Sequence, residues 1–147
     1  MTEKYPSEPT EAKVITNEAF EKLDAAQHEQ AEALAKRIAA ILDAKKALDL
    51  KVLNVKEQTV LADFLVFASG TSTTQVNAMA DEVEFKLSQD GTEPLRVEGR
   101  GSGSWVLLDY GSVIVHVFGR ESKEFYKLDK LWSAGVEVAL DKIPEQQ

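Results

Sequence analysis

Few residues in this chain could do chemistry. The 147 residues contain no cysteine and only two histidines, His28 and His116. Thiolate nucleophiles and thiolate metal sites are therefore excluded, and a histidine-rich zinc site is not expected. Asp109 has no second acid two positions away, so the D-x-D pair that often holds a metal is absent there. From these residues we predict neither a metal nor a cofactor.

His116 is the obvious candidate for a general base, but its surroundings favour another role. It lies inside the apolar run Val113–Phe118. A Ser-His-acid site would need partners that sequence spacing does not reveal. We therefore interpret His116 as a packed, hydrogen-bonded histidine of the core.

Two segments rich in glycine and serine could hold a phosphate group. A phosphate cradle needs a helix N-terminus after its glycines, whereas Gly99–Gly103 is followed by an apolar run typical of a strand. We interpret that segment as a hairpin connection. Ser69–Ser72 stands between a strand pattern and a helical pattern, where backbone N–H groups could hold an anion. No lysine follows as in a P-loop, so we expect Ser72 to cap the helix together with Gln75.

One more group has unusual chemistry, at the end of a predicted turn. It consists of Trp105, Leu108, Asp109 and Tyr110. Aromatic rings beside an acid suit a protein contact, because Trp and Tyr anchor interfaces and a carboxylate can pair with Arg or Lys. The alternative puts Trp105 in the core and Asp109 merely in the turn. On the residues alone both interpretations stay open.

The element that must position these residues is a hairpin from Trp105 to Phe118. Gly111 can supply the positive φ that a tight turn needs. With a two-residue loop, one face of the hairpin carries Trp105, Leu107, Asp109, Ile114, His116 and Phe118. The other face carries Val106, Leu108, Val113, Val115 and Val117. Both faces are largely apolar, so we expect these strands inside a sheet covered on both sides.

The remaining elements follow from the spacing of apolar residues. Helical spacing predicts a helix over Glu29–Lys46 and a second that begins after Ser72 and ends before Gly91. Further strands are predicted at Leu50–Val55, Phe64–Ser69 and Pro94–Glu98, and a short final helix between Phe125 and Gly135. This order indicates an α/β fold with a mixed sheet of about five strands covered by helices.

Phe85 does not belong to the apolar stripe of the second predicted helix. It falls on the side opposite Val83 and Leu87, which belong to the apolar stripe. Either a neighbouring element covers the ring, or Phe85 serves a contact between two copies of the chain.

Composition and charge narrow the class of partner. No apolar run approaches the roughly 20 residues that span a bilayer. The acidic N-terminus resembles neither a secretory signal nor an Arg-rich transit peptide, so we expect a cytoplasmic protein. A formal net charge of −8 opposes a dominant direct contact with nucleic acid and favours a basic protein partner.

We predict three parts along the chain. Residues 1–28 form an N-terminal extension that is partly disordered, with a weak helical pattern from Asn17, its possible N-cap. Residues 29–135 form one domain, and residues 136–147 form a polar C-terminal tail.

Six pieces in this order resemble one known family, the ribosomal silencing factors, also called the Iojap or RsfS family. They are Asp63–Ser72, Ala80–Val83, Pro94–Gly99, Trp105–Gly111, Val113–Phe118, and the group Phe125, Tyr126, Leu128, Leu131 and Trp132. Each piece alone is weak, but together they span roughly Glu29–Ser133 and are specific. One departure is Ser112, where the family usually has an acid.

The resemblance implies a fold similar to nucleotidyltransferases without catalytic residues, and a protein that is not an enzyme. It implies binding to the large ribosomal subunit through the ribosomal protein numbered fourteen. That position blocks joining of the small subunit and represses translation under nutrient limitation. Family members are often dimeric when free. The family's binding surface carries over to Trp105, Leu108, Asp109 and Tyr110. The alternative is a nucleotide-handling enzyme on the same fold, but no paired carboxylate stands beside Gly70–Ser72.

Overall fold

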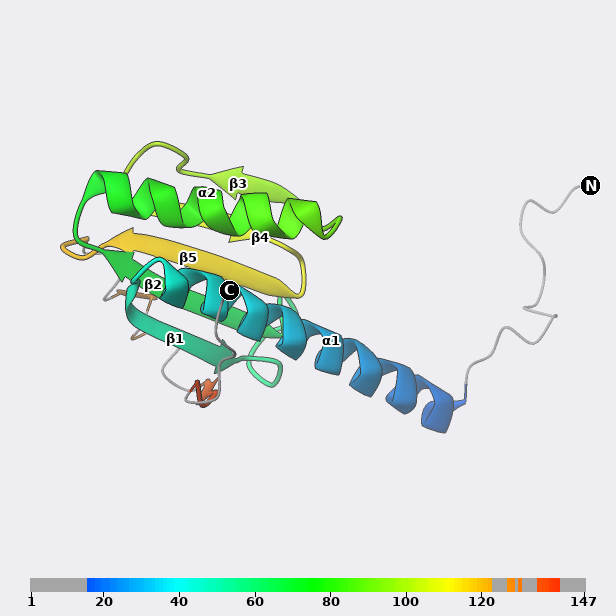
Figure 1. The fold of residues 1–147 in the computed structure, drawn as a ribbon. Coiled ribbons are helices and arrows are strands. Elements are labelled where there is room, and N and C mark those ends of the chain that lie inside the picture. Colours follow the sequence, from blue (N-terminus) through cyan, green and yellow to red (C-terminus); the bar gives the residue numbers. More distant parts are fainter. Residues whose placement is uncertain (1–15, 123–126, 129, 131–134, 141–147) are drawn as a thin grey trace, which may run out of the picture.

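A computed structural model describes residues 16–122, 127–128, 130 and 135–140. Its elements are α1 (Asn17–Ala44), β1 (Leu48–Asn54), β2 (Phe64–Gly70), α2 (Thr73–Gln89), β3 (Arg96–Glu98), β4 (Trp105–Asp109), β5 (Val113–Gly119) and β6 (Val136–Glu137). In this described part of the chain they build one sheet with two helices, as Figure 1 shows. The predicted final helix lies mostly outside the described residues.

The strands form a mixed sheet in the order β3-β4-β5-β2-β1-β6. β2 and β5 run parallel, and the other neighbouring pairs are antiparallel. The five predicted strands are all present, and β3 lies at an edge, where Pro94 just before it costs no ladder bond. The sixth strand, β6, was missed, because a two-residue strand within a polar segment carries no periodic pattern. It pairs with β1 through Leu53 and Asn54.

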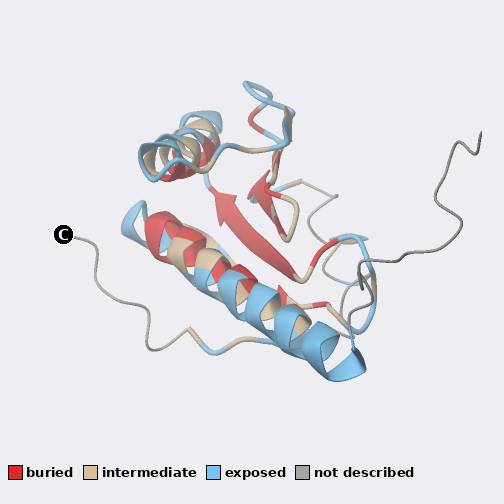
Figure 2. Cartoon of the chain, turned by 90° about the vertical axis from the view of Figure 1, so that its right-hand side faces the viewer, coloured by how far each residue is buried: buried red, intermediate tan, exposed pale blue. Residues whose placement is uncertain are grey.

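Both helices lie on the same face of the sheet. α1 packs on β1 and β2, and α2 packs on β4 and β5. Every residue of β2 is buried, and the strand lies inside the sheet between β5 and β1. Figure 2 shows the buried positions along the sides of the helices and strands that face one another. Side chains of β2 alternate between this main core, with Phe64 and Val66, and a smaller cluster on the other face, with Leu65 and Phe67.

The smaller cluster shows how the second face of the sheet is covered. Phe67, Phe118 and Leu65 are buried there, and Trp105, Ile114 and Leu128 pack against them. Leu128 comes from the segment in which the final helix was predicted, and it contributes to the low exposure of this face. The apolar character of both hairpin faces is thereby explained.

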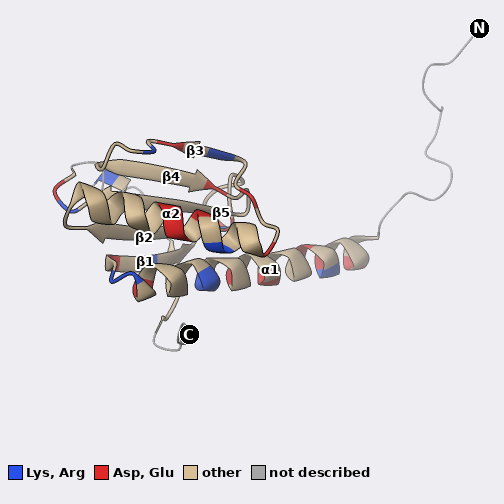
Figure 3. Cartoon of the chain, turned by 45° about the horizontal axis from the view of Figure 1, so that its top comes forward, with Lys and Arg blue, Asp and Glu red and all other residues tan. Residues whose placement is uncertain are grey.

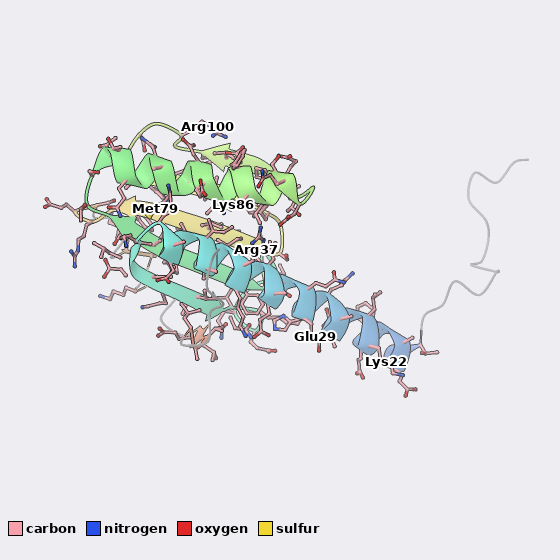
Figure 4. All side chains as sticks on the ribbon, viewed as in Figure 1. Lys22, Glu29, Arg37, Met79, Lys86 and Arg100 are labelled. Carbon is pink, nitrogen blue, oxygen red and sulfur yellow. The ribbon has the colours of Figure 1, made fainter. Side chains whose placement is uncertain are left out.

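α1 is longer than the sequence predicted. It begins at Asn17, where the sequence showed a weak helical pattern, and continues without a break through Glu29, where the predicted helix began. Its N-cap is Thr16 rather than Asn17, since the Ala19 N–H donates to Thr16 Oγ1 at 3.0 Å. Residues 17–28, assigned to the extension, are thus the first turns of a continuous helix. Figures 1 and 4 show why the apolar pattern is weak there: this end of α1, with Lys22, projects beyond the sheet.

The projecting part of α1 is still fastened to the domain at His28. Its ring stacks on Phe64 with 4.9 Å between centroids, and its Nδ1 lies 2.8 Å from Asp63 Oδ2. One turn earlier, Asp24 pairs with Lys56 at 3.0 Å. The loop between β1 and β2 therefore holds this part of the helix.

A second ion pair joins the two helices to each other. Arg37 of α1 lies 2.9 Å from Asp90, the C-cap residue of α2. Figure 4 shows Arg37 on the side of α1 that faces α2. The pair ties the middle of α1 to the end of α2.

The predicted limits of α2 are confirmed. The Gln75 N–H donates to Ser72 Oγ at 3.0 Å, as expected for an N-cap. The Gln75 side chain accepts from the Thr71 N–H at 2.8 Å, not from the Ser72 N–H as in a full capping box. Gly91, with φ +84°, follows the C-cap Asp90 and ends the helix.

Candidate partner-binding site at the β4–β5 hairpin

The hairpin has the register that the alternating pattern predicts. Trp105 pairs with Phe118, Leu107 with His116 and Asp109 with Ile114. The Tyr110 N–H donates to the Val113 carbonyl at 2.9 Å, so Gly111 and Ser112 form the two-residue loop. Gly111 has φ +86°, the conformation for which glycine was expected.

The four predicted site residues lie on two different faces. Trp105 and Asp109 are partly exposed on the face away from the helices. Leu108 and Tyr110 belong to the core beneath α2, and they are 0% and 9% exposed. A partner can reach Trp105 and Asp109 directly, whereas contact with Leu108 would require the core to open. Residues next to one another in a strand cannot share a face, which is why the structure separates this group.

The indole of Trp105 is held on one side by the sheet. Its ring stacks on Phe118 with 5.5 Å between centroids and an interplanar angle of 20°. Its Nε1–H donates to His116 Nδ1 at 3.1 Å. Because Trp105 is only partly buried, it both packs on the core and offers an edge to solvent. The core interpretation describes the packed side of the indole, whereas a contact with a partner stays a prediction.

His116 is the packed, hydrogen-bonded histidine that the sequence indicated. It is 6% exposed and stacks on Phe67 with centroids 5.3 Å apart. Burial lowers the pKa of His116 to about 4. The ring is therefore neutral at pH 7, with Nδ1 free of a proton to accept from Trp105.

The two carboxylate oxygens of Asp109 have different partners. Its Oδ1 accepts from the Gly111 N–H at 2.8 Å, which stabilises the turn. Its Oδ2 lies 3.3 Å from Arg96 Nε, and Arg96 also reaches Glu98 at 2.6 Å. Figure 3 shows these charges of both signs side by side along β3 and the end of β4. Arg96 was not predicted as a site residue, because its position opposite Asp109 follows only from the pairing of β3 with β4.

A small hollow adjoins the Trp105 indole. It has a volume of about 140 Å³ and is lined by Glu98, Gly99, Trp105 and Leu107. Leu107 is partly exposed and lies across from His116. Sequence reasoning had placed Leu107 on the same face as Trp105 but had not named it as a site residue. The exposed surface at this edge of the sheet is thus Trp105, Leu107 and the charged pair Arg96–Asp109.

The glycine-rich segment before β4 holds the backbone of Trp105. A Cβ at Gly99, which has φ +80°, would collide with the Trp105 carbonyl oxygen. The Ser102 hydroxyl donates to that carbonyl at 3.2 Å and accepts from the Trp105 N–H at 3.3 Å. The interpretation of Gly99–Gly103 as a hairpin connection is confirmed, since it leads directly from β3 into β4.

The other segment rich in glycine and serine, Ser69–Ser72, opens onto a larger cavity at the ends of the parallel strands β2 and β5. This cavity of about 330 Å³ is lined by Gly70, Thr71, Ser72, Thr73, Gly103, Ser104, Gly119, Arg120, Glu121 and Ser122. Glu121 is the one acid among these described lining residues. Across the described part of the chain, no cluster of three or more His, Cys, Asp or Glu side chains could hold a metal ion.

Phe85 is exposed, as its position off the helical stripe indicated. It is 58% exposed, whereas Val83 and Leu87 on the same helix are 0% and 1% exposed. No described element covers the Phe85 ring, so the interpretation that a neighbouring element covers it does not hold within the described residues. Phe85 borders a hollow of about 290 Å³ together with Asp81, Glu84, Ser88, Glu93 and Arg100. Self-association through Phe85 stays a prediction.

Tyr110 lies beneath α2. Its hydroxyl is buried without a hydrogen-bond partner among the described residues. Burial, followed by the nearby charges of Glu84 and Glu93, raises the pKa of Tyr110 to about 12. The phenol is therefore neutral at pH 7, and its ring serves the packing of the hairpin against α2.

Comparison with known proteins agrees with the family that the motifs resemble. Residues 28–147 match the family model described as "Ribosomal silencing factor during starvation". The ribosomal silencing factor RsfS of Halalkalibacterium halodurans is 38% identical over 69% of this chain and 87% of its own length. A crystal structure from Bacillus halodurans has 36% identity and a TM-score of 0.66, covering 76% of this chain and 99% of that one.

A more distant relative comes from mouse. The protein named "Mitochondrial assembly of ribosomal large subunit protein 1" is 28% identical over 74% of this chain and 51% of its own length. No described helix is long and apolar enough to cross a membrane. The family model covers most of the chain, and the bacterial relative is well above 30% identical over most of its own length. The chain belongs to the ribosomal silencing factor family.

Proposed function

We propose that this protein acts in the cytoplasm as a non-enzymatic repressor of translation. It binds the large ribosomal subunit through the ribosomal protein numbered fourteen. Bound there, it occupies space that the small subunit needs, so the two subunits do not join. The repression serves cells under nutrient limitation. Membership of the silencing factor family supports this role.

The observation that carries the proposal is the exposed edge of the hairpin. Trp105 and Leu107 present apolar surface next to the Arg96–Asp109 pair, on a strand whose other face is buried. An aromatic anchor surrounded by charged groups is the usual composition of a protein interface. Leu108 and Tyr110, the other two predicted site residues, support this edge from the core.

The overall charge agrees with such a partner. The chain carries a formal net charge of −8, which would attract a basic protein and repel bare phosphate groups. Proteins that lie on ribosomal RNA are commonly basic, because they neutralise phosphates. Ser112 stands where the family usually has an acid after the turn glycine, so this turn carries one negative charge fewer. We expect the remaining charge at this turn, from Asp109, to contribute at the rim of the contact.

The alternative function is nucleotide handling on a nucleotidyltransferase-like fold. The cavity beside Gly70, Ser72 and Gly119 is where a nucleotide would bind, since it lies at the ends of two parallel strands. Phosphoryl transfer needs metal ligands held close together, and Glu121 is the single acid among the described residues that line this cavity. This geometry favours the repressor over the enzyme.

Subunit joining tests the proposal directly. Purified small and large subunits are mixed at a magnesium concentration that supports joining, with and without the protein, and are separated on a sucrose gradient. We expect fewer joined ribosomes and co-sedimentation of the protein with large subunits, without added nucleotide. Unchanged joining at saturating protein contradicts the proposal, and a strict need for a nucleoside triphosphate would favour the enzyme.

A further inference from the structure

The orientation of the Trp105 side chain depends on one particular neighbour. Phe118, directly opposite in the sheet, contacts the face of the indole. Stacking alone would also accept the indole flipped over, with its N–H edge pointing the other way. The hydrogen bond from Trp105 Nε1 to His116 Nδ1, at 3.1 Å, selects one of these two orientations.

His116 is itself firmly held. Its ring lies at near-parallel angles to Phe67 (18°) and Phe118 (11°), with centroids 5.3 Å and 6.0 Å away. It is 6% exposed, on a strand with paired neighbours on both sides. A side chain fixed in this way is a rigid acceptor, so it can set the position of a partly exposed neighbour.

The protonation state follows from the geometry. An indole N–H can only donate, so His116 Nδ1 must accept and the proton of the neutral ring must reside on Nε2. A doubly protonated ring would present an N–H toward the indole N–H and break the contact. The hydrogen bond therefore needs neutral His116 in a single tautomer.

We propose that His116 is a positioning residue for the partner contact: by accepting the Trp105 indole N–H, it fixes which edge of the indole faces the ribosomal partner. This inference rests on the function proposed above. It assigns a specific role to a buried histidine that would otherwise count only as core. Trp105 touches the partner, whereas His116 acts through Trp105.

Two substitutions separate the acceptor from the packing. His116→Asn keeps an acceptor, because the amide oxygen of Asn is as many bonds from the backbone as Nδ1 of histidine, but it loses the ring. His116→Phe keeps a ring between Phe67 and Phe118 but has no acceptor. A role in packing alone predicts that Phe is the better replacement, whereas a positioning role predicts that Asn is.

The experiment measures binding to isolated large subunits for the wild type and both variants, with thermal unfolding recorded alongside. We expect His116→Phe to bind about tenfold more weakly, a change of about 1.4 kcal/mol, and His116→Asn to stay within about threefold of the wild type. In a Trp105→Ala background, His116→Phe should change the affinity less than about twofold, because its effect passes through the missing indole.

A spectroscopic measurement makes the test independent of the ribosome. In the ¹⁵N-labelled protein, the indole N–H resonance of Trp105, assigned by its loss in Trp105→Phe, should move in His116→Phe and stay near its wild-type position in His116→Asn. An unmoved resonance in His116→Phe overturns the inference. Binding by a folded His116→Phe that equals the wild type overturns it too and leaves the proposed function standing.

Failure of the proposed function looks different. If the wild type does not bind large subunits, the function falls and the positioning role falls with it, even if the resonance shifts as expected. If His116→Asn and His116→Phe weaken binding equally, or additively with Trp105→Ala, His116 is a packing residue. Each of these results is distinct from the expected one.

Discussion

Replacing Trp105 by alanine should weaken partner binding strongly while leaving most of the protein folded. The indole contributes stacking on Phe118 of about 1 kcal/mol and a hydrogen bond to His116 of about 1 kcal/mol. Because the ring is only partly buried, the loss of folding free energy should stay near 2–3 kcal/mol, below the roughly 3–5 kcal/mol typical of a fully buried aromatic residue. A domain with about 5–15 kcal/mol of stability remains folded after that loss.

Trp105→Ala should lower the affinity for large subunits more than it lowers the fraction of folded protein. An aromatic anchor at the centre of an interface contributes about 2 kcal/mol or more, so the affinity for large subunits should fall about thirtyfold. Leu108→Ala is the matched control, because Leu108 lies on the same strand but on its buried face, where it is 0% exposed. Its truncation should cost about 2–5 kcal/mol of stability and little affinity.

The assay is co-sedimentation with large subunits at several protein concentrations, paired with urea unfolding of each variant. Affinities are compared after correction for the folded fraction. Wild-type affinity in Trp105→Ala would refute the reasoning. An equal loss in Leu108→Ala would refute it as well, because it would show that core packing, not the exposed edge, controls binding.

The remaining predictions concern charge, self-association and pH. Asp109→Asn keeps the acceptor for the Gly111 N–H, so it should weaken binding by about 1 kcal/mol or less, and titrations at rising salt should show the difference shrinking. Phe85→Glu should shift any dimer toward monomer in sedimentation velocity. Leu95 is also an exposed apolar residue, and Leu95→Glu should leave the dimer unchanged. A Phe85→Glu variant that stays dimeric argues against this contact. Burial lowers the pKa of His116 to about 4, so as pH falls below about 6.5 this histidine is protonated in the unfolded chain before it is protonated in the folded protein. The wild type should therefore lose up to about 3 kcal/mol more stability by pH 4 than His116→Phe does. Equal losses of stability in urea unfolding would exclude this cause.

The hairpin could be predicted in detail because its information is local. Alternation of side chains and one glycine define the register, and Trp105 is indeed opposite Phe118. The cap of α2 is local in the same sense, since Ser72 and Gln75 are three residues apart. Such features depend on residues close in the chain, so a single sequence carries them.

Features that depend on distant pairing could not be predicted. Arg96 reaches Asp109 only because β3 pairs with β4, and β6 exists only because it pairs with β1. The sequence showed only a weak helical pattern between Asn17 and Glu29, for a related reason. The first turns of α1 project beyond the sheet, so they lack the apolar stripe by which a packed helix is identified.

The predicted site illustrates a further limit. Trp105, Leu108, Asp109 and Tyr110 were grouped because they lie close together along the chain, yet a strand directs neighbouring residues to opposite faces. The structure keeps Trp105 and Asp109 at the surface and turns Leu108 and Tyr110 toward α2. The sequence grouped these residues by their chemistry, but only the three-dimensional arrangement separates the partly exposed pair from the buried pair.

The buried residues beside Trp105 affect how this partly exposed side chain would bind a partner. The strand that carries Trp105 is anchored from behind by Val106 and Leu108, both 0% exposed, and its exposed indole is fixed by His116 from the side. A side chain that is already ordered loses little conformational entropy on binding, whereas a free one loses about 0.5–1.5 kcal/mol. In the proposed contact, His116 therefore contributes to partner affinity without touching the partner, by presenting Trp105 in one orientation before contact.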